Sequence, residues 1–155
     1  MIKVEIPGRG MFNFENAVFD YNGTIAVDGD VNSETEKNIK KLGELLNIYI
    51  LTADTYGTVN KKCGHLPAEI KVFPGDEASK HKKEIVENLK GQTICFGNGF
   101  NDIEMFKSAD LSVCIIDEEG CCGKIIAHSD IVVKSINDGF NLLFRTNRIK
   151  ADLRG

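Results

Sequence analysis

The chain contains short runs of apolar residues separated by polar stretches. Runs of this kind, rich in Val, Ile and Phe and bounded by Gly, Pro, Asn or Asp, are typical of buried β-strands. Alternating apolar positions on both sides of Pro7 and Gly8 predict an N-terminal hairpin, made by residues 2–6 and by the segment that holds Phe12 and Phe14. The other predicted strands cover residues 17–19, 48–51, 69–73, 93–96, 111–116 and 131–133.

Between these runs, apolar residues recur at the three- and four-residue spacing of amphipathic helices. Ser33 is expected to cap the first helix, with Glu36 at the capping-box position. The basic residues from Arg145 to Arg154 are expected to face solvent. The other predicted helices are a short one after Asp54 and the segments 76–90, 101–109, 121–127 and 136–144.

Strands and helices thus alternate along the chain. This pattern predicts a three-layer, Rossmann-like α/β fold, a parallel sheet with helices on both faces, in a single domain over residues 1–155. In such sheets ligands bind at the carboxyl ends of the strands. The predicted strands end in polar groups at Asp20, at Thr52 and at Gly97 with Asn98. We therefore expect a binding site at this edge of the sheet.

Composition narrows the classes of function. Of the 155 residues, 42% are hydrophobic and 27% are charged, which is usual for globular domains, and the formal charge is −4. General nucleic-acid binding requires a basic surface, so no nucleic-acid partner is expected. No apolar run approaches the roughly 18 residues that span a bilayer, and residues 1–20 lack a signal-peptide pattern. We therefore expect a cytoplasmic protein without a membrane partner.

The five cysteines do not form the spaced pairs of a disulfide framework or a zinc ribbon. Cys95 and Cys114 lie inside predicted strands and are expected to pack in the core. Cys63 and His65 together offer too few ligands for a metal site.

The residues at the predicted strand ends carry groups suited to phosphoryl transfer. Asp20 can act as a nucleophile toward phosphorus and as a ligand of a hard cation. The Thr52 hydroxyl, with the backbone N–H of Ala53, can hold a phosphoryl oxygen, and Lys82 can neutralise the charge that develops on it. The glycine-rich turn after the next strand adds a second carboxylate, Asp102, for magnesium. The order of acid, hydroxyl, lysine and acidic turn favours this interpretation more than any single residue does.

Each segment also has a purely structural interpretation. Asn22 and Gly23 are typical of a type I′ turn, which would pair the flanking segments as a hairpin. Asp54 can serve as a helix cap, and the glycine-rich turn can be an ordinary connection between a strand and a helix. Lys80, Lys82 and Lys83 lie on one charged helix face, so each lysine taken alone is expected to be solvated, and Lys80 and Lys83 are alternatives to Lys82 as the phosphate-binding lysine.

Together these motifs resemble the haloacid dehalogenase superfamily of phosphotransferases. Within it, they are most similar to the phosphorylation domain of P-type ATPases and to small soluble P-type-ATPase-like proteins. The resemblance covers residues 15–135. The DxDGT motif matches Asp20, Asn22, Gly23 and Thr24; the strand ending in Ser or Thr matches Thr52; K-x-E-x-V-x-x-L matches Lys82, Glu84, Val86 and Leu89; and GDGxND matches residues 97–102.

The resemblance implies that Asp20 attacks phosphorus in line and forms an aspartyl-phosphate, with magnesium as the cofactor. Positioning and charge stabilisation supply most of what phosphoryl transfer needs. By matching motifs, the resemblance assigns catalysis to Asp20, Asn22, Thr52 and Lys82, phosphate binding to Thr52, Ala53 and Lys82, and magnesium binding to Asp20, Asn22, Asn98 and Asp102.

Two residues depart from the family pattern. Asn22 stands where family phosphatases have an Asp that protonates the leaving oxygen and then activates water. An amide does neither, and general acid–base catalysis contributes about 10²–10⁴-fold, so we expect slow turnover. Asn98 stands where the family has a metal-binding Asp, and the missing charge predicts weaker magnesium binding.

The family's cap domains are inserted after the first motif or between the second and third. Here residues 25–32 suit only a small flap that turns at Asp28 and Gly29, and residues 55–79 hold one short helix and a strand. The resemblance therefore implies an uncapped, open site. Uncapped relatives accept macromolecular substrates or use a neighbouring subunit as a lid, so the expected partners are a phosphorylated small molecule or a phosphoprotein, and a homo-oligomer is an option.

The leading prediction is a magnesium-dependent phosphohydrolase or phosphotransferase with low turnover. The alternative is a catalytically degraded module that binds phosphate or phosphoproteins, because both departures fall in catalytic motifs. A receiver domain also uses Asp, Thr and Lys at strand ends, but its phosphorylated Asp ends the third strand and follows an acidic pair, unlike Asp20. A dinucleotide site is disfavoured because no G-x-G-x-x-G follows a strand.

Overall fold

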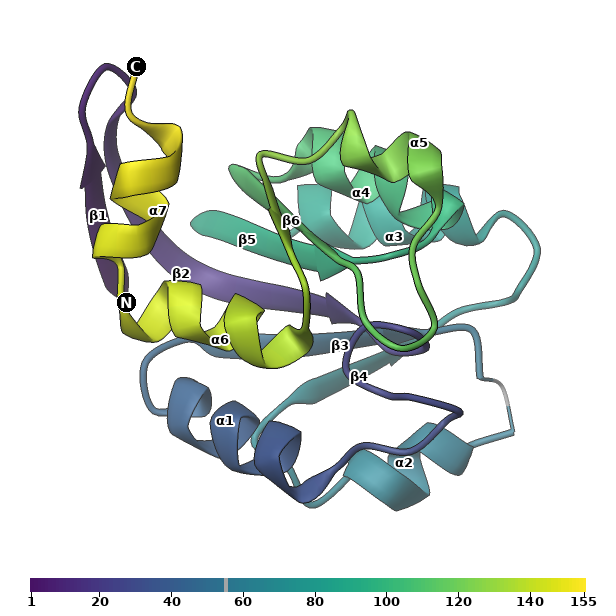
Figure 1. The fold of residues 1–155 in the computed structure, drawn as a ribbon. Helices are drawn as coiled ribbons and strands as arrows, with labels where there is room; N and C mark the ends of the chain where they lie inside the picture. The colour runs from purple at the N-terminus through teal and green to yellow at the C-terminus, as the bar shows by residue number, and fades with distance from the viewer. Residues whose placement is uncertain (55) are drawn as a thin grey trace.

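The computed structural model describes residues 1–54 and 56–155 and forms three layers (Figure 1). Residue 55, which begins the segment 55–79 considered above, lies outside the described residues. Six parallel strands follow the order β4-β3-β2-β5-β6-β7, and β1 pairs antiparallel with the first half of β2. The strands are β1 (Ile2–Ile6), β2 (Gly10–Asp20), β3 (Asn47–Thr52), β4 (Glu69–Val72), β5 (Gln92–Gly97), β6 (Leu111–Ile115) and β7 (Ile131–Val133).

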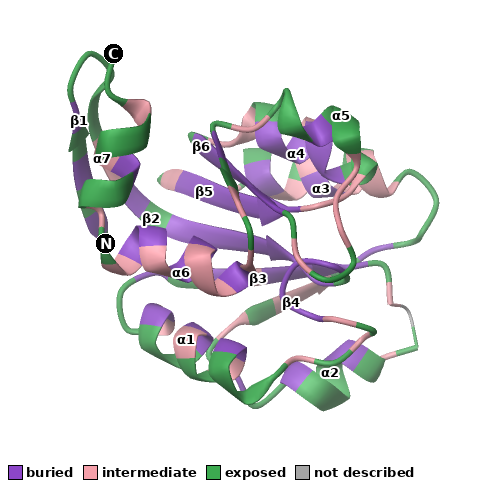
Figure 2. Ribbon diagram, viewed as in Figure 1, coloured by how far each residue is buried: buried purple, intermediate pink, exposed green. Residues whose placement is uncertain are grey.

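Helices cover both faces of this sheet. On β2, Phe19 points into one apolar cluster and Val18 into the other, as the two-residue period of a strand requires. The strands are largely buried between helices whose outer faces are exposed (Figure 2). One cluster lies under α1 (Ser33–Gly43), α2 (Thr58–Cys63), α6 (Ile136–Phe144) and α7 (Asn147–Leu153), and the other under α3 (Ala78–Glu87), α4 (Ile103–Ser108) and α5 (Gly123–Ile126). This arrangement confirms the predicted fold class.

Cys95 and Cys114 are buried in the second cluster, as their place in predicted strands indicated. Among the helices that the structure describes, none combines the length and the apolar character needed to cross a membrane.

The strand that carries Asp20 is longer than the pattern predicted. The predicted hairpin forms, but its second strand continues through Asn16 to Asp20 as one eleven-residue strand with an irregularity between Phe14 and Asn16. Asn16 is buried, and its amide donates to the carbonyl of Lys90 (2.8 Å) and accepts from Asn47 (3.1 Å). Asn16 interrupts the apolar pattern of the strand in the sequence, but its hydrogen bonds accommodate it inside the sheet.

Several helix boundaries differ from the predictions. Ser33 is the first residue of α1 and not its cap; Asn32 is the cap, and its side chain accepts from the N–H of Thr35 at 2.8 Å. Glu36 contacts His65 instead of closing a capping box. The helix predicted over 76–90 covers only Ala78–Glu87, and the one over 101–109 divides into a 3₁₀ turn at Phe100–Asp102 followed by α4.

The C-terminal segment was expected only to face solvent, but it forms the additional helix α7. Its residue Ile149 is fully buried, and the helix packs against β1 and β7. Arg145, Arg148 and Arg154 are exposed, as predicted. The tail therefore packs an apolar face on the N-terminal hairpin. The many basic residues of the tail made this face hard to recognise in the sequence.

The residues after Asp20 form a compact turn and not the two-residue hairpin considered as an alternative. The carbonyl of Tyr21 accepts bonds from the N–H groups of residues 24–26, at 3.0–3.3 Å. Gly23 has a φ of +79°, in the left-handed region that favours glycine. Val27 and Asp30 then exchange two 3.0 Å backbone bonds and close a small loop, residues 27–30, beside the site.

Candidate active site

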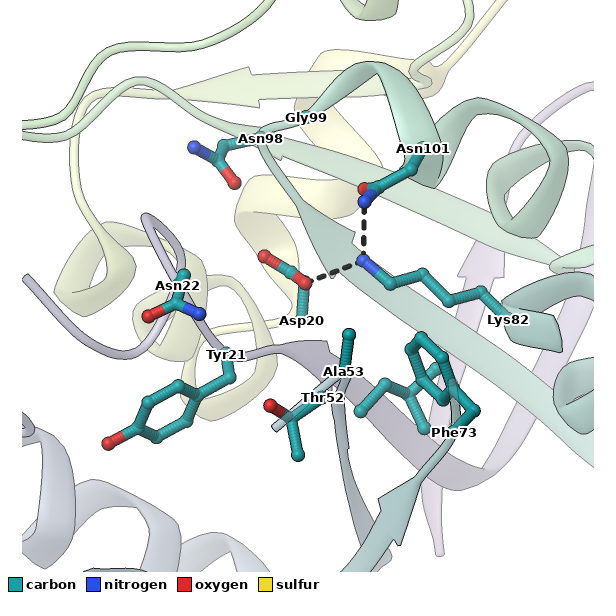
Figure 3. Close-up of a pocket in the computed structure, with 11 residues that line it drawn as sticks. Asp20, Tyr21, Asn22, Thr52, Ala53, Phe73, Lys82, Asn98, Gly99 and Asn101 are labelled. Atoms are coloured by element: carbon teal, nitrogen blue, oxygen red, sulfur yellow. Dashed lines mark hydrogen bonds and ion pairs between the residues drawn. The ribbon is translucent and has the colours of Figure 1, made fainter. Parts of the chain in front are cut away.

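A pocket of about 240 Å³ opens at the carboxyl ends of β2, β3 and β5 (Figure 3). All of the site residues predicted from the sequence line it, except Asp102. The parallel sheet thus brings together groups that are up to 78 positions apart in the chain, from Asp20 to Asn98. The lining residues are Asp20, Tyr21, Asn22, Leu51, Thr52, Ala53, Phe73, Lys82, Asn98, Gly99 and Asn101.

Asp20 is the last residue of β2, which lies between β3 and β5. It is buried, with 8% of its surface exposed. Its Oδ1 atom accepts from the Lys82 ammonium at 2.6 Å. Among the described residues, the Oδ2 atom accepts a single long bond, 3.3 Å from the Thr24 hydroxyl. One carboxylate oxygen is therefore held by lysine, and the other has capacity left for a further partner.

Lys82 enters the site from α3, and only 3% of its side chain is exposed. Its ammonium donates to Asp20 and to Asp102, each at 2.6 Å, and to the Asn101 side chain at 3.0 Å. Lys80 is exposed and lies 3.8 Å from Glu77, and Lys83 is half-buried and lies 3.7 Å from Glu87. The structure therefore brings Lys82, and neither neighbouring lysine, to the pocket.

Asp102 lies behind Lys82 and is fully buried. Its Oδ1 atom accepts from Lys82, and its Oδ2 atom accepts from the backbone N–H groups of Asn98 and Gly99 at 3.0 and 2.9 Å. A side chain at Gly97 would collide with this carboxylate, which explains the glycine there. Both oxygens of Asp102 are thus engaged in holding the lysine and the turn.

The buried charges perturb one another. Burial and the charge of Asp102 raise the pKa of Asp20 to about 7, against the opposing effect of Lys82. Burial alone would lower the pKa of Lys82, but the two carboxylates raise it above its ordinary value. With both carboxylates ionised, the three groups carry one net negative charge. A phosphate dianion therefore needs an additional cation to enter this pocket.

Thr52 ends β3, and its hydroxyl accepts from the N–H of Asp54 at 3.1 Å. The Asp54 carboxylate accepts in turn from the N–H groups of Tyr56 and Val59, at 3.1 and 2.7 Å. Gly57, and not Asp54, is the N-cap of α2, but the Asp54 carboxylate still bonds the first turn of that helix through Val59. Thr52 and Ala53 remain facing the pocket.

Asn98 lies at the edge of the pocket. Its Oδ1 atom accepts from the Thr24 hydroxyl at 3.3 Å, and its Nδ2 donates to the carbonyl of Gly120 at 3.1 Å. A Cβ at Gly23 would collide with the Asn98 amide, so these two turns are packed directly against each other. Asn22 also lines the pocket, on the side of the Tyr21 ring (Figure 3).

The pocket offers oxygen atoms to a hard cation. These are Oδ2 of Asp20 and Oδ1 of Asn98, and the resemblance adds the backbone carbonyl of Asn22, another lining residue. Magnesium prefers oxygen ligands and retains several waters, so one carboxylate with two neutral oxygens suits it in kind, at low charge. No group of three or more His, Cys, Asp or Glu side chains able to hold a metal occurs in residues 1–54 and 56–155.

Five lining residues were not among the predicted site residues: Tyr21, Leu51, Phe73, Gly99 and Asn101. Leu51 and Phe73 lie at or just after strand ends, so the rule that found Thr52 also applies to them. Tyr21 follows Asp20 directly, and its hydroxyl donates to the carbonyl of Gly29 at 2.9 Å. Asn101 was detectable only as part of its motif.

The fold and the pocket together define an α/β protein with a carboxylate–lysine site at the carboxyl edge of a parallel sheet. A model of haloacid dehalogenase-like hydrolases matches residues 76–139. An uncharacterised protein of Methanocaldococcus jannaschii is 47% identical over 78 residues, which cover 47% of this chain and 84% of that protein. A soluble P-type ATPase-like phosphatase of the same organism is 24% identical over 119 residues, covering 74% of this chain. The chain spans only 44% of that phosphatase.

Solved structures share the fold. The cobalt-bound deoxy-D-mannose-octulosonate 8-phosphate phosphatase of Haemophilus influenzae superimposes with a TM-score of 0.71 at 12% identity, over 90% of this chain and 92% of that one. The corresponding Moraxella catarrhalis phosphatase, in complex with magnesium, phosphate and its sugar, gives 0.65 at 14% identity, over 89% and 90%. The family match over residues 76–139 and these similar proteins confirm the resemblance found in the motifs of this chain.

Proposed function

We propose that the chain is a magnesium-dependent phosphohydrolase or phosphotransferase that acts through an aspartyl-phosphate on Asp20. The observation that carries the proposal is the position of Asp20, at the end of the central strand and on the floor of a pocket it shares with Lys82 and Thr52. The match to haloacid dehalogenase-like hydrolases and the similarity to a soluble P-type ATPase-like phosphatase support the general activity. The names of the structural neighbours support a phosphorylated small molecule as substrate and a divalent metal.

In the proposed reaction, one carboxylate oxygen of Asp20 forms a bond to phosphorus while the bond from phosphorus to the leaving oxygen breaks. Water then cleaves the aspartyl-phosphate and releases phosphate. The Lys82 ammonium and the Thr52 hydroxyl, with the backbone N–H of Ala53, bind the phosphoryl oxygens. Asp102 is proposed to orient Lys82, in place of the direct metal contact predicted from the sequence, because both of its oxygens are already engaged.

Asp20, the backbone carbonyl of Asn22 and Oδ1 of Asn98 would hold the magnesium ion. When bound, the ion supplies the positive charge that offsets the net negative charge of the site beside an incoming phosphate. With a single carboxylate among these ligands, we expect binding weaker than in relatives with an aspartate in place of Asn98.

Turnover is proposed to be slow because the amide of Asn22 neither donates a proton to the leaving oxygen nor activates water. Replacing it by a carboxyl group should restore general acid–base catalysis, worth about 10²–10⁴-fold. Asn22→Asp is therefore expected to raise kcat within this range. A kcat that does not rise would contradict this account of the slow step.

The test of the proposed function is beryllofluoride binding in the presence of magnesium, measured by fluorine NMR. Beryllofluoride is a mimic of a phosphoryl group on a carboxylate, so wild type should bind it and Asp20→Ala should not. Asp152→Ala changes an exposed aspartate on α7 and serves as the matched control. Binding that persists in Asp20→Ala would exclude Asp20 as the phosphoryl acceptor.

A non-catalytic phosphate- or phosphoprotein-binding module remains the alternative, and the specific observation in its favour is that Asn22 and Asn98 stand where the family motifs have aspartates. This alternative predicts that the wild type does not hydrolyse p-nitrophenyl phosphate, whatever the magnesium concentration. Hydrolysis by wild type that is lost in Asp20→Asn excludes the alternative.

Three features stay predictions from the sequence: the single-domain organisation with a flap over residues 25–32, homo-oligomerisation and a cytoplasmic location.

A further inference from the structure

Two side chains that line the pocket each donate a hydrogen bond to the backbone of a rim segment. The Tyr21 hydroxyl donates to the carbonyl of Gly29 at 2.9 Å. The Asn98 amide donates to the carbonyl of Gly120 at 3.1 Å. Residues 27–30 and residues 117–122, which connect β6 to α5, are hereafter called the rim. Pocket and rim are therefore tied together at two points.

The two rim segments also contact each other. The carboxylate of Glu119 accepts from the backbone N–H of Asp28 at 3.1 Å. In Figure 1 the connection from β6 to α5 reaches down to the turn that follows β2. A continuous path of contacts thus runs from Tyr21 through Gly29, Asp28, Glu119 and Gly120 to Asn98.

The 117–122 segment is fixed at both ends as well. Asp117 accepts from the N–H of Ile136, at the start of α6, at 3.1 Å. The N–H of Cys122 donates to the backbone carbonyl of Asn98 at 2.8 Å. Asn98 consequently bonds this segment twice, once through its side chain and once through its backbone.

The chemistry of this contact requires an amide. The Asn98 side chain accepts through Oδ1 from Thr24 and donates through Nδ2 to Gly120. A carboxylate only accepts, so an aspartate at this position would face the Gly120 carbonyl with a second acceptor. It would also add a third carboxylate beside Asp20 and Asp102, which share one ammonium ion. An aspartate at position 98, the usual residue in the family, is therefore incompatible with this position of the rim.

We propose that Asn98 is a positioning residue that holds the 117–122 segment against the 27–30 loop, and that the rim so formed is the wall that contacts the leaving group of the substrate. The pocket itself, at about 240 Å³, is smaller than the roughly 300–1,000 Å³ of ordinary ligand sites. A leaving group of any size must extend beyond it, and the rim adjoins the pocket at Tyr21 and Asn98. The inference about the leaving group rests on the proposed function, while the inference about Asn98 does not.

The first test is hydrogen–deuterium exchange in EDTA, which needs neither metal nor activity. Asn98→Asp keeps the acceptor for Thr24, loses the donor to Gly120 and adds a carboxylate, so the backbone amides of residues 117–122 should exchange about tenfold faster. Asn98→Ala should also accelerate them and serves as a second variant if Asn98→Asp does not fold. Asn38→Asp removes an equivalent side-chain donor between α1 and α6 and is the matched control. Exchange within twofold of wild type in both Asn98 variants would overturn the assignment.

The second test separates binding from chemistry. Glu119→Ala breaks the contact between the rim segments without altering a residue that lines the pocket. We expect its KM for p-nitrophenyl phosphate to rise at least threefold, with kcat unchanged and with the KM for acetyl phosphate, whose leaving group is small, unaffected. Equal KM values for wild type and variant would overturn the role of the rim. Absence of activity in wild type would count against the proposed function and would leave the exchange result to decide on Asn98.

Discussion

Lys82→Met tests the charge arrangement of the pocket directly. The side chain of Lys82 is 3% exposed and lies 2.6 Å from both Asp20 and Asp102, of which Asp102 is fully buried. Methionine keeps the length and the helix propensity of lysine, so the main change is the loss of the charge. Removing one partner of a buried ion pair costs about 3–5 kcal/mol, because it leaves uncompensated charge in the interior.

Urea unfolding in EDTA at pH 8, followed by circular dichroism, measures this cost. With a slope near 2 kcal/mol per molar urea, the midpoint should fall by about 2 M. Lys83→Met is the matched control, because the side chain of Lys83 is 42% exposed and lies 3.7 Å from Glu87, an ion pair worth about 0–1 kcal/mol. The difference should shrink at pH 5, where a proton can neutralise one unpaired carboxylate. Equal midpoints for the two variants at pH 8 would refute the reasoning.

Three further outcomes are expected. The free energy of unfolding of the metal-free wild type should fall as the pH rises from about 4 to about 7, because the folded state retains a proton on Asp20 that the unfolded state releases. Urea titrations at several pH values should show that Asp20→Asn flattens this dependence. Gly23→Ala should destabilise more than Gly57→Ala in thermal unfolding, since both have positive φ but only Gly23 abuts Asn98; equal losses would contradict that contact. Ile149→Ala should cost about 2–5 kcal/mol in urea unfolding, and a cost below about 1 kcal/mol would show that α7 contributes little.

Most of the pocket followed from the sequence because its residues stand directly after buried parallel strands. Such strands read as continuous apolar runs, and the polar residue that follows each run has to lie at the carboxyl edge. Asp20, Thr52 and Asn98 all satisfy this rule and all line the pocket. Lys82 was selected by its match to the family motif, because pattern alone put it with Lys80 and Lys83 on a charged helix face.

The missed features depend on contacts between distant segments. Asn16 looks like a strand break until the partners from Lys90 and Asn47 are known. Helix α7 owes its place to Ile149 against β1, which no local pattern in a basic tail reveals. Asp102 looks like a ligand in its motif, but the structure gives its oxygens to Lys82 and to two backbone N–H groups. In each case tertiary hydrogen bonds or packing decided the outcome.

The central place of β2 has a consequence for the order of assembly during synthesis. The strand that carries Asp20 is made early, yet its neighbour β5 is complete only at residue 97. A ribosome-bound chain that ends before this point exposes one long edge of β2, and unpaired edges of this kind recruit other strands. Truncated chains that stop between β4 and β5 should therefore accumulate in inclusion bodies, whereas the full chain should not.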